Sequence, residues 1–202
     1  EGPDNFFGFP FGAEDVDQNG WGSWLAGGRS EGMPNAAYAF GIGIQRYFVQ
    51  HDADWDYRNM DFAAFEKEAY PLAQVLNSNN PDLSAFRARG GKLLLFHGWA
   101  DVALTAHMST DYVSRVYKHD PAAAEDVRLF MMPGVLHCAG GEGPFQADWI
   151  EALRTWHTSG VAPETINASH PAREGARKLC AWPKQARHQG GNIEDPASYV
   201  CE

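Results

Sequence analysis

The sequence predicts an α/β fold built around a parallel sheet, and three observations favour this class. Apolar runs at residues 93–96 and 127–132 have the length and composition of buried strands. Helical periodicity at 105–118 and 145–159 follows each run, which gives the strand–helix–strand–helix order of a parallel sheet. Hydrophobic residues make up 44% of the 202-residue chain, which is enough for a globular core.

The N-terminal part of the chain predicts fewer regular elements. Residues 1–36 are expected to be irregular, because Gly, Pro and aromatic residues interrupt every helical or alternating period. Residues 37–50 are apolar on several faces and predict a buried helix. Asp61 is placed to cap a helix that runs to about Leu76.

The second half predicts the sheet and its covering helices. The run of large apolar residues between glycines in GGKLLLFHG predicts a strand that is buried on both faces. The helix expected at 145–159 has a helically spaced apolar set, namely Trp149, Ile150, Leu153 and Trp156. The last forty residues are polar and predict an irregular tail.

An aspartate and a histidine follow the two predicted strands. Asp101 comes shortly after the first strand and His137 shortly after the second. Functional groups of open α/β sheets gather at the carboxyl ends of the strands, so these side chains can form the orienter–base pair of a nucleophilic triad. The order Asp then His is also that of α/β-hydrolases. A cap or another satisfied polar group at each strand end is an equally good interpretation.

A serine nucleophile is harder to find. The only G-x-S-x-G pattern places Ser30 between Gly28 and Gly32. A nucleophile elbow needs a buried strand before it and a helix after it, and neither is predicted here. A loop serine is therefore the preferred interpretation, and the predicted sheet has too few strands before Asp101 for a complete hydrolase.

Charge, histidines and acidic runs exclude several other functions. A net charge of −10 argues against nucleic acid or an anionic membrane as the main partner, and no apolar run is long enough to span a bilayer. His97, at the end of the first strand, is expected to be a satisfied core histidine, and the other histidines show no metal spacing. Residues 13–20, AEDVDQNG, lack the glutamate and the spacing of an EF-hand calcium loop.

Three segments carry a resemblance to a known family: DLSAFRARGGKLLLFHGWAD, RLFMMPGVLHCAGGEGP and WHTSGVAPETINAS. They resemble the C-terminal half of the tannase/feruloyl esterase family, which includes mono(2-hydroxyethyl) terephthalate hydrolases. Similarity in YFVQHDADWDY and at the C-terminus extends the resemblance over nearly the whole chain. It implies the C-terminal portion of an α/β-hydrolase fold, with its last parallel strands and helices, together with the end of a loop-rich lid.

The resemblance also implies roles for particular residues. Asp101 would orient the base His137 of a Ser-Asp-His triad, whose serine would lie on an N-terminal part of the enzyme outside this sequence. Cys138 would form a disulfide with a cysteine beside that serine and so tie the histidine loop to the nucleophile. The other two of the three cysteines, Cys180 and Cys201, would close a loop in the tail.

The resemblance implies three divisions of the chain: 1–60 as the end of a lid-like, aromatic-rich irregular segment, 61–160 as the C-terminal part of the α/β-hydrolase core, and 161–202 as an irregular, disulfide-closed tail packed on that core. No cofactor is expected in this chain, although the resemblance allows a structural calcium in the rest of the lid.

The expected activity is a secreted (extracellular or periplasmic) serine esterase that acts on small esters of aromatic, phenolic acids. Lid residues would face the substrate, which makes Trp21, Trp24 and Phe40 candidates for binding it, although core packing explains each equally well. The expected partner is the N-terminal portion with the nucleophile, and neither nucleic acid nor a membrane. The alternative function is a catalytically inactive fragment that acts as a binding or structural module.

Overall fold

The computed structural model describes residues 7–27 and 34–202. They divide into two compact units, one formed by residues 7–15 with 80–202 and the other by residues 16–27 with 34–79. The boundary predicted at residue 60 falls inside the second unit, in which α2 (Phe62–Leu76) packs on the preceding helical segment η2 (Gln45–Val49).

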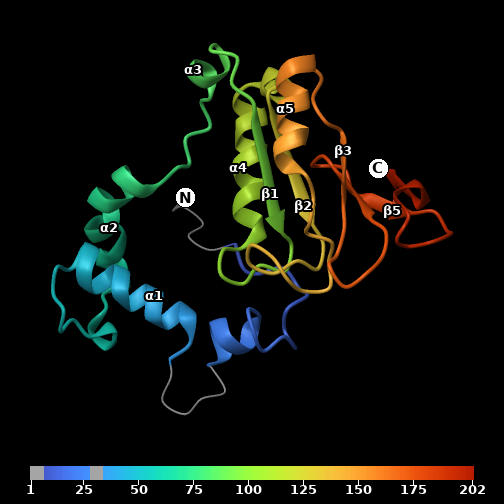
Figure 1. Cartoon of the computed structure of the whole chain (residues 1–202). Coiled ribbons are helices and arrows are strands. Elements are labelled where there is room, and N and C mark those ends of the chain that lie inside the picture. The colour runs from blue at the N-terminus through green and yellow to red at the C-terminus, as the bar shows by residue number, and fades with distance from the viewer. Residues whose placement is uncertain (1–6, 28–33) are drawn as a thin grey trace. The chain divides into compact units, whose positions relative to one another are not determined.

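Two parallel strands form the centre of the first unit (Figure 1). Strand β1 (Leu93–Gly98) pairs with β2 (Val127–Met132) along its whole length, with Leu93 opposite Val127 and Gly98 opposite Met132. Helix α4 (Ala106–His119) connects them, and α5 (Trp149–Ser159) follows β2. The predicted strand–helix–strand–helix order is therefore confirmed. Helix α5 begins later than expected because Asp148 caps it by accepting from the Glu151 amide.

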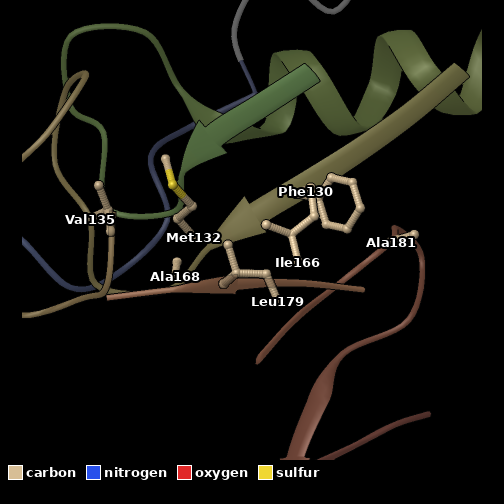
Figure 2. Packing of buried hydrophobic residues seen from close by; sticks show 7 residues of the cluster. All are labelled: Phe130, Met132, Val135, Ile166, Ala168, Leu179 and Ala181. Atoms are coloured by element: carbon tan, nitrogen blue, oxygen red, sulfur yellow. The ribbon is translucent and has the colours of Figure 1, made fainter. Parts of the chain in front are cut away.

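Alternate residues of the strands face two separate apolar clusters. Val127 and Leu129 pack with Val113 and Val116 of α4. Phe130 points to the opposite face. It joins residues from the end of β2, from the loop after β2 and from the tail, which Figure 2 labels: Met132, Val135, Ile166, Ala168, Leu179 and Ala181. This two-residue alternation places one helix on each side of the strand pair.

Strand β1 is less buried than its composition predicts. Leu93, Leu94 and Leu95 are half-buried, and Phe96 is 45% exposed although its ring stacks on Trp149. Among the described strands, β1 pairs with β2 alone, so its other edge has no strand beside it. The prediction of a strand buried on both faces is therefore wrong for this chain, because the described elements leave β1 only partly covered and full burial of a parallel strand requires that both of its faces be covered.

The tail is more regular than predicted. Strand β3 (Thr165–Ala168) pairs antiparallel with β4 (Arg177–Cys180), and β5 (Ala186–His188) pairs antiparallel with β6 (Tyr199–Cys201). The Cys180–Cys201 disulfide joins β4 to β6. The expected irregular tail is thus corrected to two short antiparallel pairs, and apolar residues of the β3–β4 pair complete the cluster under Phe130.

The second unit is helical. Helix α1 (Ala36–Ile44) continues into η2, and η1 (Gly22–Ala26) and η3 (Tyr57–Asn59) are short turns of helix. The prediction of a buried helix at 37–50 is wrong in this unit, since Phe40 is 65% exposed and Tyr47 62% exposed. The cap predicted for α2 is confirmed, because Asp61 accepts from the amides of Ala63 and Ala64.

Ionic contacts fix the amino ends of the two central strands. Arg87, at the end of α3 (Ser84–Arg87), donates from Nε to Asp126 at 2.7 Å and also pairs with Asp120. Lys92 pairs with the same Asp126, which lies between η4 (Pro121–Glu125) and β2.

The remaining element, η5 (Pro196–Ser198), precedes β6. Within the described residues, no helix has the length and apolar character needed to cross a bilayer.

Candidate active site

The carboxyl ends of β1 and β2 bring their two following loops into contact. The Trp99 amide donates to Met132 O at 2.8 Å and the Ala100 amide donates to Val135 O at 3.0 Å. Gly98 permits this approach, because a Cβ at its position would overlap the backbone carbonyls of Val135 and Leu136. The sheet edge therefore holds the two loops side by side, as expected for functional groups of a parallel sheet.

Asp101 lies at the bottom of the loop after β1 and is 2% exposed. Its Oδ1 accepts from the amides of Ala103 and Leu104 at 2.8 and 2.9 Å, so the carboxylate caps its own loop. Burial raises the pKa of Asp101, but hydrogen bonds from His97, His137 and the two amides outweigh it and lower the pKa to about 2. Asp101 is therefore a carboxylate at neutral pH.

His137 lies on the loop after β2 and contacts this carboxylate directly. Its Nδ1 is 2.9 Å from Asp101 Oδ2, and the sequence-predicted acid–base pair is thus brought together. Since a carboxylate can only accept, Nδ1 carries the proton of the neutral ring, and Nε2 is left as its basic nitrogen. The histidine side chain is 32% exposed against 3% for the Asp101 side chain, so the pair has a buried acid and an accessible imidazole.

The histidine loop folds back on itself through glycines. The Gly143 amide donates to Gly134 O at 3.0 Å, and Leu136 donates to Gly140 O at 3.2 Å. Gly134, Gly140 and Gly141 all have φ between 71° and 82°, the left-handed region in which glycine is favoured. A Cβ on Gly141 would also overlap Gly134 O, whereas one on Gly140 would meet nothing.

The segment after β3 holds the histidine loop from outside. His170 donates from Nε2 to Gly141 O at 3.2 Å, and its Nδ1 accepts from the Ala172 amide. Arg173 donates to Glu142 O at 2.6 Å and forms an ion pair with the Glu142 carboxylate. The tail is therefore a structural support for the loop that carries His137.

Cys138 is exposed next to the histidine. It has a φ of 63°, which is uncommon for a residue with a side chain, and its Sγ is 3.7 Å from His137 Nε2. Because Cys180 and Cys201 are bonded to each other, neither of them is the partner of Cys138.

The sequence missed the involvement of His97. Its Nε2 lies 3.3 Å from Asp101 Oδ2, the oxygen that also contacts His137. The residue was expected only to be a satisfied core histidine, and its hydrogen bonds to Ser109 and Leu104 agree with that. The available signal was its position, four residues before Asp101 at the end of a strand that leads into a tight turn.

The other predicted site residues lie in the second unit or outside the described residues. Trp21, Trp24 and Phe40 belong to the second unit, where Trp24 and Phe40 stack with ring centroids 5.8 Å apart. Ser30 falls outside the described residues. In the described part of the chain, no three His, Cys, Asp or Glu side chains gather as a metal site would require, so the described residues do not fit a structural calcium.

A parallel strand pair that delivers a buried carboxylate and an accessible imidazole from adjoining loops is α/β-hydrolase-like in architecture. The family model for tannase and feruloyl esterase matches residues 1–202, and the chain belongs to this family.

Known proteins of this family resemble the chain over most of its length. It is 33% identical to a mono(2-hydroxyethyl) terephthalate hydrolase of Piscinibacter sakaiensis, over 90% of this chain and 34% of that protein. It is 31% identical to a probable feruloyl esterase of Arthroderma benhamiae, over 84% and 34% of the two chains. The crystal structure of feruloyl esterase B from Aspergillus oryzae superposes with a TM-score of 0.76 at 25% identity, over 90% of this chain and 39% of that one. The chain thus spans about a third of the length of the curated relatives that it matches.

Proposed function

We propose that this chain is the C-terminal portion of a serine carboxylic-ester hydrolase that acts on esters of aromatic, phenolic acids. The hydrogen bond between Asp101 and His137 is the observation that carries the proposal. The names of the relatives describe hydrolases of ferulate and terephthalate esters, and both acids are aromatic, which supports the aromatic part of this substrate class; ferulate alone is phenolic.

In the proposed reaction, His137 Nε2 takes the proton of a serine hydroxyl as the serine oxygen attacks the ester carbonyl. Asp101 holds the tautomer with the proton on Nδ1 and stabilises the imidazolium that forms. The imidazolium then protonates the departing alcohol, which leaves an acyl-enzyme. Water releases the aromatic acid by the same sequence, with His137 again as the base.

The serine belongs, in this proposal, to an N-terminal portion of the same enzyme that is not part of this sequence. The edge of β1 that is open among the described strands supports it, because the unpaired backbone N–H and C=O groups of such an edge can pair with a further strand. Exposed Cys138 would form a disulfide with a cysteine next to that serine, which would bring the nucleophile to His137. The structural Cys180–Cys201 disulfide supports secretion to an oxidising compartment, extracellular or periplasmic.

The test uses the complete protein that contains this chain and a panel of gallate, ferulate and terephthalate esters. His137→Ala is expected to lower kcat by several orders of magnitude, as loss of a triad base does. His157→Ala, on the exposed side of α5, serves as the matched control and should leave kcat unchanged. A loss below about tenfold for His137→Ala would remove it as the base.

The partner is tested by intact mass with and without reduction. A serine-containing segment bonded through Cys138, whether from a second polypeptide or from the same one, supports the proposed disulfide. Hydrolysis of no ester in the panel, together with a free Cys138 thiol in the complete protein, would favour the binding or structural module instead.

A further inference from the structure

His97 and His137 converge on one oxygen of Asp101. His137 Nδ1 lies 2.9 Å from Oδ2, and His97 Nε2 lies 3.3 Å from the same atom. The other oxygen, Oδ1, is already occupied by two backbone amides of its own loop. The position of Oδ1 is therefore set locally, while the two imidazoles share Oδ2.

The partners of His97 fix which of its nitrogens carries a proton. Nε2 is 2.9 Å from the carbonyl oxygen of Leu104, which can only accept, so Nε2 must be a donor. Nδ1 is 2.7 Å from the hydroxyl of Ser109, which can either donate or accept. The single N–H on Nε2 is therefore shared between Leu104 O, the nearer acceptor, and Asp101 Oδ2, in the neutral and in the charged form of the ring alike.

Burial makes this donor effective. The His97 side chain is 14% exposed and the Asp101 side chain 3%, so little water competes for Oδ2. Among the groups that lower the pKa of Asp101, the His97 hydrogen bond acts most strongly against the effect of burial. Ser109, in the first turn of α4, sets the rotation of the His97 ring from the opposite side.

We propose that His97 is a positioning residue for the acid–base pair: held by Ser109 and Leu104, it directs Oδ2 of Asp101 at His137 Nδ1. This inference rests on the proposed function only in that His137 is taken as the base. His97 acts through Asp101 and is separated from the reacting ester by it.

Three variants of the complete protein test whether His97 acts through its N–H donor or through the packing of its ring. His97→Gln retains an N–H near the position of Nε2 and keeps the donor to Asp101. His97→Asn is shorter and places its amide near Nδ1, where it reaches Ser109 but not Asp101. Ser109→Ala releases the ring and leaves the donor in place. His107→Asn is the matched control, since His107 is a half-buried histidine of α4 whose ring packs on Trp99.

Two readouts are measured for each variant. One is the far-downfield proton resonance of His137 Nδ1–H, assigned by its loss in His137→Ala. The other is the separation of kcat from KM. For His97→Asn we expect the resonance to weaken or move upfield and kcat to fall by up to about 100-fold with KM little changed, as for a misplaced catalytic group. His97→Gln should restore both readouts to near wild type, and Ser109→Ala should lie between them.

Equal losses in His97→Gln and His97→Asn would show that the ring acts by packing and would overturn the proposal, as would full activity and an unchanged resonance in both. If the wild-type protein hydrolyses no ester of the panel, the proposed function fails. The resonance then still decides whether His97 orders the pair of Asp101 and His137.

Discussion

The loops after β1 and β2 hold the two members of the pair by different means. The acid loop is closed by its own carboxylate, since Asp101 accepts from amides two and three residues further along the chain. The loop after β2 (residues 133–148), which carries His137 and is called the base loop below, has left-handed glycines. It is anchored from the tail, where His170 and Arg173 donate to its backbone carbonyls. Asp101 is thus positioned by contacts within its own loop. The loop of His137 is held by residues 29 and 31 positions further along the chain, since His170 binds Gly141 and Arg173 binds Glu142.

This difference assigns distinct tasks to the two sides of the pair. A buried carboxylate with four donors has little freedom to move, because leaving any donor unpaired carries a free-energy penalty. The imidazole lies on a more exposed loop whose position depends on the tail. We therefore expect changes at the acid to alter chemistry, and changes in the tail to alter how well the base is placed.

The largest effect is expected for Asp101→Asn in the complete protein. The amides of Ala103 and Leu104 require the amide oxygen of Asn on their side, so its NH2 group would face His137. That arrangement forces the proton of His137 onto Nε2, the wrong nitrogen for a base, and kcat should fall by about 10⁴-fold with KM little changed. Steady-state kinetics with the best ester of the panel measure it. A fall below about tenfold would mean that Asp101 does not set the tautomer.

A smaller effect is expected from a methyl group on the base loop. Gly141→Ala would strain a residue with a φ of 82° and also overlap Gly134 O, whereas Gly140→Ala, at 81°, adds only the backbone strain. We expect Gly141→Ala to lower kcat by up to about 100-fold by displacing His137. Gly140→Ala should lower the free energy of unfolding by about 1 kcal/mol and change kcat little. Equal kinetics for the two variants would show that the overlap with Gly134 O does not displace His137.

The lowered pKa of the Asp101 carboxyl group predicts that the free energy of unfolding depends on pH. Because the folded pKa of Asp101, about 2, lies below its ordinary value of 3.8, its carboxylate stabilises the fold fully above pH 4. This contribution, about 2 kcal/mol, is lost as the pH falls through the range from 4 to 2. The difference in unfolding free energy between wild type and Asp101→Asn should shrink over that range, as measured by urea denaturation.

The sequence predicted those parts of the fold that depend on short-range patterns. The two strands, the cap at Asp61 and the placement of Asp101 and His137 after the strand ends each follow from residues close in the chain. The tail strands were not predicted, because four-residue segments such as β3 are too short for an alternating pattern to emerge. Helix α1 was recognised by its apolar composition, but composition does not say whether a covering surface lies within the same unit.

The same limit applies to the site. Strand-end position predicted the meeting of Asp101 and His137, since parallel strands end at a common edge. The second imidazole on Asp101 was missed because a strand that enters a tight turn brings residues four apart together, which the strand period alone does not reveal. The support from His170 and Arg173 depends on how the tail returns to the sheet, and no local pattern encodes that return.

The smallest effect is expected from the anchor in the tail. Arg173→Ala removes the hydrogen bond to Glu142 O and the ion pair with the Glu142 side chain, which is 91% exposed. An exposed ion pair contributes little, so most of the loss comes from the bond to the carbonyl, about 1 kcal/mol. We expect kcat to fall less than tenfold, with KM unchanged and the resonance of His137 broadened but present. Arg154→Ala, which removes an exposed ion pair within α5, is the control. A loss as large as that of Asp101→Asn would show that the tail supplies more than support to the base.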